Sequence, residues 1–340
     1  MSDAWKTNCT LDEVAAWVRR CSKICVLTHL KPDGDAVGSA LGACRAIRHA
    51  TSVRADCWFA GPMPTFFEEV ASEDEWHVLG TSDIPAREYD GVLIVDTGSW
   101  NQLEPMHGFL EGRGKECTVL DHHRQGDADV AARLYVDVDA AAASIIVGEL
   151  ATKLFGGVRV SELPKPVAEA LLVGLASDTG WFRHSNTDAR ALWFASQLVA
   201  AGVEYSRLYE IVQQRDRPGR LRLMGRALCS MELLKGDSVA LMTVKIADFE
   251  AAGATQGDSG GFSDLPLAIK GVAVGVVITE GADRDGPIAK VSMRSKDGPG
   301  AVDVNVVAGK LGGGGHARAA GARMRCSMEE GRRRVLEALG

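Results

Sequence analysis

The sequence has no long apolar run, no excess of basic residues and no closely paired cysteines. Its apolar stretches fall short of the roughly 20 residues that a membrane-spanning helix needs, so no membrane contact is expected. The first residues lack the basic start and apolar stretch of a secretory signal. The formal net charge is −7. This charge argues against a protein that coats long nucleic acid, which needs a broad basic surface, but it allows a small anionic substrate in a metal-loaded cleft.

The eight cysteines are scattered along the chain, which favours buried, reduced thiols in a cytoplasmic protein over disulfides or structural zinc. No repeat of 20–50 residues and no low-complexity tail is visible. With 46% hydrophobic and 24% charged residues, the 340-residue chain has the composition of a globular protein and room for two domains.

The first half of the chain alternates short apolar runs with helical patterns. The apolar runs lie at residues 24–29, 53–59, 89–98 and 117–123, and helical patterns lie between 34 and 50 and at 139–155 and 164–178. Runs such as VLIV and TVL lack polar alternation, which is typical of parallel strands buried on both faces. We therefore predict an α/β fold with a doubly wound, mostly parallel sheet.

A long helical stretch follows at about 188–230, with Pro218 and Gly219 marking a break. New strand patterns at 238–244, 271–279 and 288–295, followed by helical and strand patterns to the end, predict a smaller α+β domain. The expected division is a catalytic domain at 1–195, a helical linker at 196–228 and a second domain at 229–340, with the active-site cleft between the domains.

Acidic and histidine side chains recur at the ends of these predicted elements. They are His29, Asp33 and Asp35 after the first strand, Asp96 after VLIV, Asp121, His122 and His123 after TVL, and Asp178 at a helix end. The carboxyl ends of neighbouring parallel strands border one crevice, so we expect these groups to converge. Converging carboxylates repel one another unless a cation is present.

Aspartate and histidine without cysteine suit Mn²⁺ or Mg²⁺ better than structural zinc. The number of ligands is sufficient for two ions that share a carboxylate, which is an arrangement that activates water for attack on a phosphoryl group.

The motifs HLKPDGDAVGS, VDTG, DHH and SDTGWFR together resemble the DHH phosphoesterase family. The later SMRSKDG and VDVNVVAGKLGGGGHARAAG resemble its DHHA1 substrate-binding domain. The resemblance implies one metal at His29, Asp33 and Asp96 and a second at Asp35, Asp96, His122 and Asp178, with Asp96 bridging. It favours Mn²⁺, with Mg²⁺ or Co²⁺ as alternatives. His123 is expected to meet the phosphate or the leaving oxygen, and Asp121 to orient its neighbours.

The run GGGGH brings backbone N–H groups within reach of an anion, although a glycine run alone is more often a flexible loop. The resemblance implies that a terminal phosphate and base are held by Arg294, Ser295, Gly313, Gly314 and His316.

The length of the chain resembles the stand-alone members of the family. These cleave RNA of about two to five nucleotides to nucleoside 5′-monophosphates and dephosphorylate 3′-phosphoadenosine 5′-phosphate (pAp), and they are often homodimers. The sequence leaves three alternatives open: cleavage of cyclic or linear dinucleotides such as cyclic di-AMP and pApA, hydrolysis of inorganic pyrophosphate, and a non-catalytic nucleotide sensor.

Overall fold

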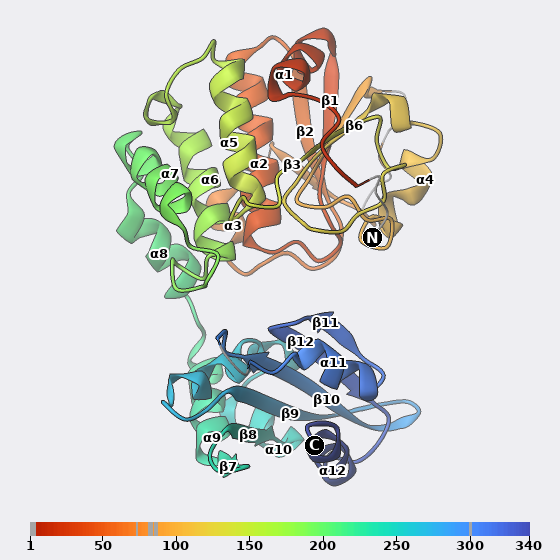
Figure 1. The fold of residues 1–340 in the computed structure, drawn as a ribbon, viewed down its shortest axis with the longest axis vertical. Helices are drawn as coiled ribbons and strands as arrows, with labels where there is room; N and C mark the ends of the chain where they lie inside the picture. The colour runs from red at the N-terminus through yellow and green to blue at the C-terminus, as the bar shows by residue number, and fades with distance from the viewer. Residues whose placement is uncertain (1–4, 73, 81–83, 85–87, 299–300) are drawn as a thin grey trace. The chain divides into compact units, whose positions relative to one another are not determined.

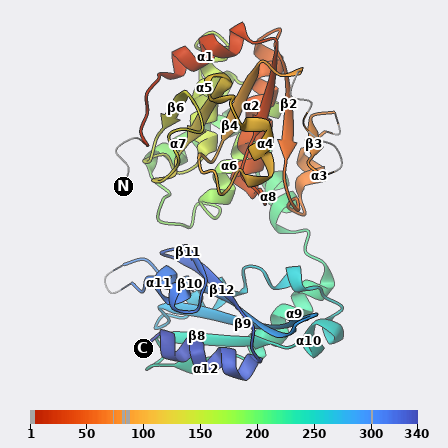
Figure 2. The same ribbon diagram turned by 90° about the vertical axis from the view of Figure 1, so that its right-hand side faces the viewer.

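The computed structural model describes residues 5–72, 74–80, 84, 88–298 and 301–340, without the side chain of His316. The chain forms two compact units, Met1–Arg215 and Asp216–Gly340 (Figures 1 and 2). The boundary falls inside the 196–228 stretch, and the expected three-part division stays a prediction. No helix in the described ranges combines the length and apolarity needed to cross a bilayer.

A six-stranded sheet in the order β3-β2-β1-β4-β5-β6 forms the centre of the first unit, and all its pairings are parallel. Its strands are β1 (Lys23–Leu27), β2 (Arg54–Phe59), β3 (Trp76–Val78), β4 (Gly91–Val95), β5 (Cys117–Asp121) and β6 (Arg133–Val136). The strand order reverses between β1 and β4, and in open α/β sheets ligands bind at the carboxyl ends of strands beside such a reversal.

Helices cover both faces of this sheet. They are α1 (Leu11–Arg20), α2 (Gly34–Ala50), α3 (Phe67–Val70), α4 (His107–Leu110), α5 (Ala143–Leu154), α6 (Lys165–Asp178), α7 (Ala189–Ala200) and α8 (Tyr205–Gln213), with 3₁₀ turns η2 (Glu104–Met106), η3 (Gly114–Glu116) and η4 (Val160–Glu162). Val26 and Val95 face the core that α1, α2, α5 and α6 share, whereas Cys25 and Ile94 face the core beside η2 and α4. Both faces are therefore buried, as the unalternated apolar runs predict.

Helix α2 begins at the first acidic motif and packs closely on α6. At Gly38 a Cβ atom would lie 2.5 Å from the backbone nitrogen of Gly174. The Gly- and Ala-rich sequence after Asp35 therefore allows two helices to approach closely enough to place Asp35 and Asp178 near each other.

The second unit contains a mixed sheet in the order β11-β12-β10-β9-β8-β7, with one parallel pair, β8 and β9. Its elements are α9 (Pro218–Cys229), β7 (Glu232–Leu234), β8 (Val239–Val244), α10 (Ile246–Ala252), η5 (Gln256–Ser259), η6 (Phe262–Ala268), β9 (Val274–Asp283), β10 (Gly286–Ser295), α11 (Val304–Lys310), β11 (Gly314–His316), β12 (Ala319–Met324) and α12 (Met328–Ala338). The predicted fold class is confirmed: an α/β unit is followed by a smaller α+β unit.

All eight cysteines lie in the described part of the chain and are free. Four of them are buried, but Cys229 is exposed, so burial is not common to all of them.

Candidate metal centre

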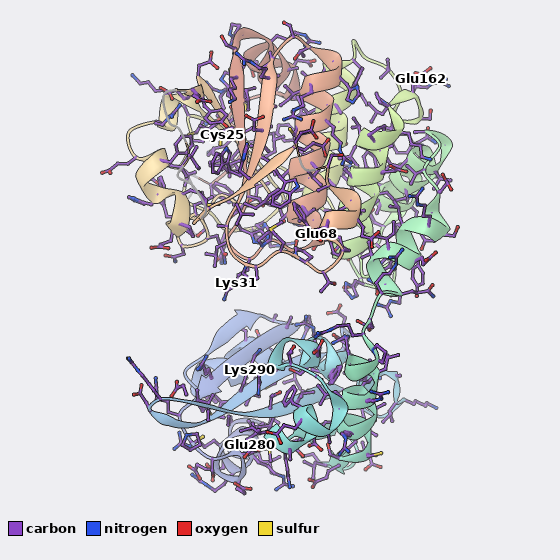
Figure 3. All side chains as sticks on the ribbon, turned by 180° about the vertical axis from the view of Figure 1, so that it is seen from behind. Cys25, Lys31, Glu68, Glu162, Glu280 and Lys290 are labelled. Atoms are coloured by element: carbon purple, nitrogen blue, oxygen red, sulfur yellow. The ribbon has the colours of Figure 1, made fainter. Side chains whose placement is uncertain are left out.

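The structure brings the predicted ligands of four loops and helix ends together at the carboxyl end of the sheet. In Figure 3, Cys25 marks β1 and Lys31 marks the loop that follows it. The oxygen and nitrogen atoms of three groups lie within 4.8 Å of one another: His29, Asp33 and Asp96; Asp35, His122 and Asp178; and Asp96, His122 and His123. The convergence expected from the strand order is therefore present.

Asp96 is the carboxylate shared by two of these three groups, and only 3% of its surface is exposed. Its Oδ2 lies 3.4 Å from Nε2 of His29, and its Oδ1 lies 3.3 Å from Nε2 of His122. Oδ1 is buried and accepts no hydrogen bond of good geometry from the described residues. Each oxygen faces a different ligand set, which is the geometry that a bridging carboxylate requires.

The backbone at Asp96 is unusual, because its φ of 60° places a non-glycine residue in the left-handed region. Such a conformation costs about 1–3 kcal/mol and persists only where the surroundings impose it. Here the backbone N–H of Asp96 donates to the carbonyl of Leu120 (3.0 Å), which continues the β4–β5 pairing up to the point where the chain turns.

Two histidines are held in a single orientation by backbone carbonyls. Nδ1 of His29 lies 2.9 Å from the carbonyl oxygen of Leu30, and Nδ1 of His122 lies 3.1 Å from that of Ala140. When Nδ1–H donates to a carbonyl, the neutral ring presents the lone pair of Nε2. Both Nε2 atoms face the carboxylates, as metal-binding histidines do when a second partner fixes their tautomer.

Asp35 is held at the start of α5, and 1% of it is exposed. Its carboxylate accepts hydrogen bonds from the backbone N–H groups of Ala143 (2.6 Å) and Ser144 (3.1 Å) and from the hydroxyl of Ser39 (3.1 Å). The helix N-terminus favours a negative charge at this point. Gly174 supplies the space, because a Cβ there would lie 2.7 Å from Oδ1 of Asp35.

Asp33 stands at the N-cap of α2. Its Oδ1 accepts hydrogen bonds from the backbone N–H groups of Asp35 (3.0 Å) and Ala36 (3.1 Å) and lies 3.8 Å from Nε2 of His29. Asp178 is the last residue of α6, and its Oδ2 lies 3.6 Å from Nε2 of His122. The start of α2 thus supplies Asp33 to the group with His29, and the end of α6 supplies Asp178 to the group with His122.

The carboxyl groups of the cluster have pKa values displaced in opposite directions. Burial, together with the charge of Asp96, raises the pKa of Asp35 well above its ordinary value, and burial raises that of Asp178 to about 6. Burial also disfavours the charge of Asp96, but His122 and His29 lower its pKa. Three carboxylates cannot all ionise comfortably in so small a volume.

The histidines respond to the same carboxylates. Burial disfavours the imidazolium, yet Asp33 and Asp96 raise the pKa of His29 to about 11, and Asp96 and Asp35 raise that of His122 to about 10. The cluster without metal therefore retains protons on both imidazoles. A divalent cation would replace these protons and balance the carboxylates.

His123 and Asp121 form a separate pair beside the cluster. Oδ1 of Asp121 accepts hydrogen bonds from the backbone N–H groups of His122 (2.7 Å) and His123 (3.2 Å) and lies 2.7 Å from Nδ1 of His123. Asp121 is fully buried, whereas 40% of the His123 side chain is exposed. Burial opposes the charge of His123, but Asp121 raises its pKa. Asp121 thus orients a partly exposed imidazole through one of its nitrogens.

The residues present fit hard divalent metal ions. The donors are carboxylate oxygens and imidazole nitrogens, no cysteine takes part, and a buried oxygen of Asp96 lacks a hydrogen-bond donor. Such a set suits Mn²⁺ or Mg²⁺. Two candidate groups share Asp96, and the number of ions and the assignment of individual ligands stay predictions.

The predicted substrate-binding residues lie in the second unit. Arg294 on β10 is half-exposed, and its Nε lies 3.3 Å from Oδ1 of Asp264. Ser295 is buried, and its hydroxyl lies 3.4 Å from Nη1 of Arg318, a residue that the sequence analysis did not include. Arg318 in turn forms an ion pair with Asp297 at 2.7 Å.

Gly313 and Gly314 lie where α11 leads into β11, and the side chain of His316 is outside the described part of the structure. A Cβ at Gly313 would lie 2.1 Å from the carbonyl oxygen of Gly321, and Gly315 has a φ of 148°. Close packing of β11 on β12 therefore requires glycine at positions 313 and 315, whether or not this segment binds an anion. Gly314 is exposed and has no such restriction, since its nearest neighbour would be 3.7 Å away.

Sequence reasoning missed the groups that support the ligands. The carbonyls of Leu30 and Ala140 are backbone atoms without a sequence signature. Ser39 follows Asp35 by one helical turn, a spacing that could have indicated the contact. The indole Nε1–H of Trp5 donates to the carbonyl oxygen of His123 (3.0 Å), although 118 residues separate the two in sequence.

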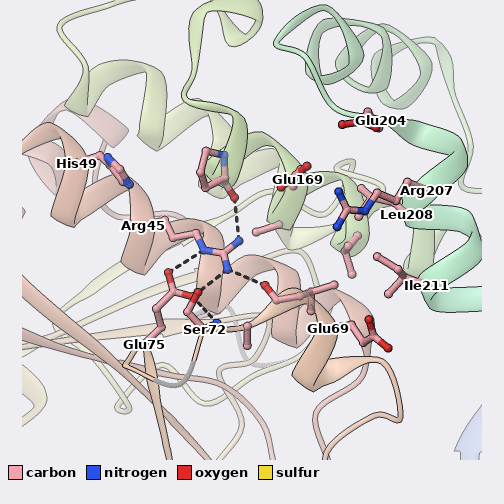
Figure 4. A pocket seen from close by; sticks show the side chains of 15 residues that line it. Arg45, His49, Glu69, Ser72, Glu75, Glu169, Glu204, Arg207, Leu208 and Ile211 are labelled. Atoms are coloured by element: carbon pink, nitrogen blue, oxygen red, sulfur yellow. Dashed lines mark hydrogen bonds and ion pairs between the residues drawn. The ribbon is translucent and has the colours of Figure 1, made fainter.

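A separate hollow of about 390 Å³ lies between α2, α6, α8 and the segment 69–75. Figure 4 shows Arg45 in its wall, with its guanidinium bound to Glu75 and to the backbone carbonyls of Val70 and Pro166. The glutamates of this wall already have basic partners, including Glu69 with Arg215 at 2.8 Å. The hollow contains none of the predicted ligands.

Comparison with known proteins agrees with this geometry. Residues 23–175 match the model of the DHH family, N-terminal domain, and residues 236–339 match that of the DHHA1 domain. The bifunctional oligoribonuclease and PAP phosphatase NrnA of Thermus thermophilus is 34% identical over 93% of this chain and 89% of its own length. The Bacillus subtilis protein of the same name is 26% identical over 86% and 87%.

Among solved structures, an exopolyphosphatase-related protein from Bacteroides fragilis superposes with a TM-score of 0.87 and 25% identity, covering 97% of this chain and 95% of that one. The strand-end ligands, the matched models and these relatives lead to the same assignment: the chain belongs to the DHH family and carries a DHHA1 domain at its C-terminal end.

Proposed function

We propose that the protein is a divalent-metal-dependent phosphoesterase that cleaves very short oligoribonucleotides to nucleoside 5′-monophosphates and converts pAp to AMP. The observation that carries this proposal is Asp96, whose two carboxylate oxygens face two separate Asp/His ligand sets. The relatives named as oligoribonuclease and PAP phosphatase supply the substrate class.

The first ion would be held by His29, Asp33 and Asp96, and the second by Asp35, Asp96, His122 and Asp178. We propose Mn²⁺ as the ion, because the donors mix imidazole with carboxylate. Two bound ions of this kind lower the pKa of water and stabilise charge on a phosphoryl group.

The residues of the chain itself have defined tasks in this proposal. Asp35 is kept in place by the start of α5, and the carbonyls of Leu30 and Ala140 keep the two imidazoles aimed at the carboxylates. The contact with Asp121 raises the pKa of His123, which favours the protonated imidazole that can donate a hydrogen bond to a phosphate oxygen or to the leaving oxygen.

Recognition of the substrate is assigned to the second unit. We propose that Arg294, Ser295, Gly313, Gly314 and His316 hold a terminal phosphate and its base. A guanidinium and exposed backbone N–H groups suit a phosphate. A site that binds only one end of the substrate favours short oligomers over long strands.

The reaction is tested by incubating the purified chain and Mn²⁺ with RNA of two to twelve nucleotides, pAp, pApA, cyclic di-AMP and pyrophosphate, and identifying products by mass spectrometry. We expect nucleoside 5′-monophosphates from the shortest RNA and AMP from pAp. Preferential cleavage of cyclic di-AMP or of pyrophosphate would replace the proposed substrates. Binding of pApA without turnover at saturating Mn²⁺ would instead indicate a nucleotide sensor.

The site is tested by Asp96→Asn, which keeps the size of the side chain and removes its charge. We expect loss of turnover with unchanged circular dichroism. Asp137→Asn is the matched control, because Asp137 also follows a strand of the same sheet but forms an ion pair with Arg190 (2.6 Å). Full activity of the Asp96 variant would refute the site.

The substrate grip is tested by Arg294→Ala, which we expect to raise KM about tenfold with little change in kcat, since it removes uniform binding. Arg323→Ala is the control, because Arg323 is an exposed residue of the same sheet that pairs with Asp283. Equal effects of the two variants on KM would count against a specific role for Arg294.

A further inference from the structure

The indole of Trp5 lies between two loops that carry candidate ligands. Its Nε1–H donates to the carbonyl oxygen of His123 at 3.0 Å, although 118 residues separate the two in sequence. Its six-membered ring lies over Gly98, two residues after Asp96, and over Gly126, three residues after His123. One side chain thus contacts both the loop after β4 and the loop after β5.

The two glycines leave room for this indole. A Cβ at Gly98 would lie 1.9 Å from Cη2 of Trp5, and a Cβ at Gly126 would lie 2.5 Å from its Cε2. Neither glycine has a positive φ. Their backbones would accept alanine, so contact with Trp5 is the structural reason for a missing side chain at both positions.

The same two loops are also joined directly. The backbone N–H of Asp127 donates to the carbonyl of Gly98 (2.7 Å), and its carboxylate accepts from the backbone N–H of Trp100 (2.8 Å). Nε1 of Trp100 donates to Asp129 (3.1 Å). The indole of Trp5 therefore packs against a pair of loops that already behave as one structural element.

The segment that carries Trp5 is fixed along the edge strand β6. The backbone N–H of Asn8 donates to the carbonyl of Leu134 (2.9 Å), and the Asn8 side chain accepts from the N–H of Leu134 (2.8 Å). The hydroxyl of Thr7 pairs with both backbone groups of Val136, at 2.7 and 2.8 Å. These hydrogen bonds fix the segment beside β6 and therefore the position from which the Trp5 indole extends toward the two loops.

We propose that Trp5 is a positioning residue of the metal centre, because its indole holds the loop of Asp96 and the loop of His122 and His123 in fixed relation to each other. This inference rests on the proposed function. In this proposal Trp5 acts through its contacts with the backbone at Gly98, Gly126 and His123.

The test compares Trp5→Ala with Trp5→Phe and with Thr10→Ala. Thr10 caps α1 through a capping box five residues further on, so its loss destabilises the same region without touching the indole. We expect Trp5→Ala to weaken Mn²⁺ binding and lower kcat at saturating Mn²⁺, each by about tenfold, as loss of a group that supports metal ligands does. KM should change less than about twofold, because substrate recognition is assigned elsewhere.

Trp5→Phe retains a ring between the glycines and loses only the N–H donor, so it should recover a large part of both losses. Thr10→Ala should lower the melting temperature and leave kcat and Mn²⁺ affinity within about twofold of wild type. Equal losses of kcat and Mn²⁺ affinity in Thr10→Ala and Trp5→Ala would overturn the inference.

A double-mutant cycle tests the route of the effect. Gly98→Ala, which displaces the indole, should lower kcat in the wild-type background. In the Trp5→Ala background the same substitution should lower kcat by less than about a further twofold. Fully additive losses would mean that Gly98 acts independently of Trp5 and would contradict the proposal.

Amide hydrogen exchange of the metal-free protein gives a readout independent of turnover. Residues 97–103 and 122–132 should exchange faster in Trp5→Ala but not in Thr10→Ala. If the wild-type chain neither bound Mn²⁺ nor cleaved RNA, the proposed function would fail. Separately, exchange rates in these two loops that were the same in Trp5→Ala as in wild type would overturn the role of Trp5.

Discussion

Replacing Asp178 with asparagine should stabilise the metal-free protein while it weakens metal binding. Asp178 ends α6, where the partial negative charge of the helix C-terminus disfavours another negative charge. Burial raises the pKa of its carboxyl from 3.8 to about 6; attraction to His122 opposes this increase, whereas repulsion from Asp96 and Asp33 adds to it. No hydrogen bond to its carboxylate would be lost from the described residues, because its contact with His122 is 3.6 Å long.

The magnitude follows from the difference between the pKa values of the folded and unfolded states. An increase from 3.8 to about 6 corresponds to about 3 kcal/mol of unfavourable free energy once the carboxyl is ionised. Since 30% of the side chain is exposed, solvent screens part of this penalty, and we expect a gain of about 2 kcal/mol. For a unit of this size the gain should raise Tm by about 4–8 °C.

The pH dependence has a definite sign. Below about pH 4 the wild-type carboxyl is protonated in both states, so the two proteins should be equally stable. Between about pH 4 and pH 6 the unfolded wild type loses its proton first, and the folded wild type becomes less stable than the variant. Above pH 6 the difference should be complete.

The assay is thermal or urea unfolding of both proteins in excess chelator at pH 4 and pH 8, followed by titration with Mn²⁺. Metal should reverse the order of stability, because it stabilises only the protein that binds it well. Asp137→Asn is the control and should be less stable than wild type, since it loses an ion pair. A chelated Asp178→Asn protein no more stable than wild type at pH 8 would refute the reasoning.

Three further predictions concern proton release, the histidine pair and the distant ion pair. Because His29 and His122 hold protons when no metal is bound, Mn²⁺ binding at pH 7 should release the protons of these two imidazoles; titration calorimetry in two buffers of different ionisation enthalpy measures this, and equal heats would contradict it. Asp121→Asn removes the charge that raises the pKa of His123 and should lower kcat by about 10–100-fold with metal content unchanged, as steady-state kinetics and metal analysis would show; an unchanged kcat would contradict that role. Glu75→Gln leaves a buried guanidinium without its counter-charge and should cost about 3 kcal/mol in urea unfolding, with kcat of the folded protein unaffected; a cost below about 1 kcal/mol would contradict this accounting.

The sheet could be predicted wherever strands are buried on both faces. The runs at β1, β4 and β5 lack polar alternation because helices or loops cover both sides. The edge strands β3 and β6 were not predicted, since they are only three and four residues long and largely not buried. The helical stretch at 188–230 is three helices, and Gly202, with a φ of 98°, lies at a break that the pattern did not indicate.

The candidate ligands could be predicted because they follow strands or helix ends at equivalent points, and topology alone brings those points together. The groups that orient these ligands could not be predicted from the sequence. The carbonyl of Ala140 and the N–H of Ala143 act as backbone, which every residue possesses, and Trp5 reaches the centre from a distant part of the sequence. The glycine run was interpreted as an anion site or a flexible loop, whereas Gly313 and Gly315 are also required by the close packing of β11 on β12.

The left-handed backbone at Asp96 bears on how such a centre could be lost in evolution. Glycine adopts this conformation more readily than aspartate. Replacement of Asp96 by glycine would relax the chain and disable the shared carboxylate in a single step, but it would also remove the negative charge that the imidazoles of His29 and His122 stabilise. In a descendant that no longer needed the ions, loss of Asp96 should therefore be accompanied by replacement of His29 or His122, and an aspartate kept at this turn together with both histidines would identify the lineages that still use them.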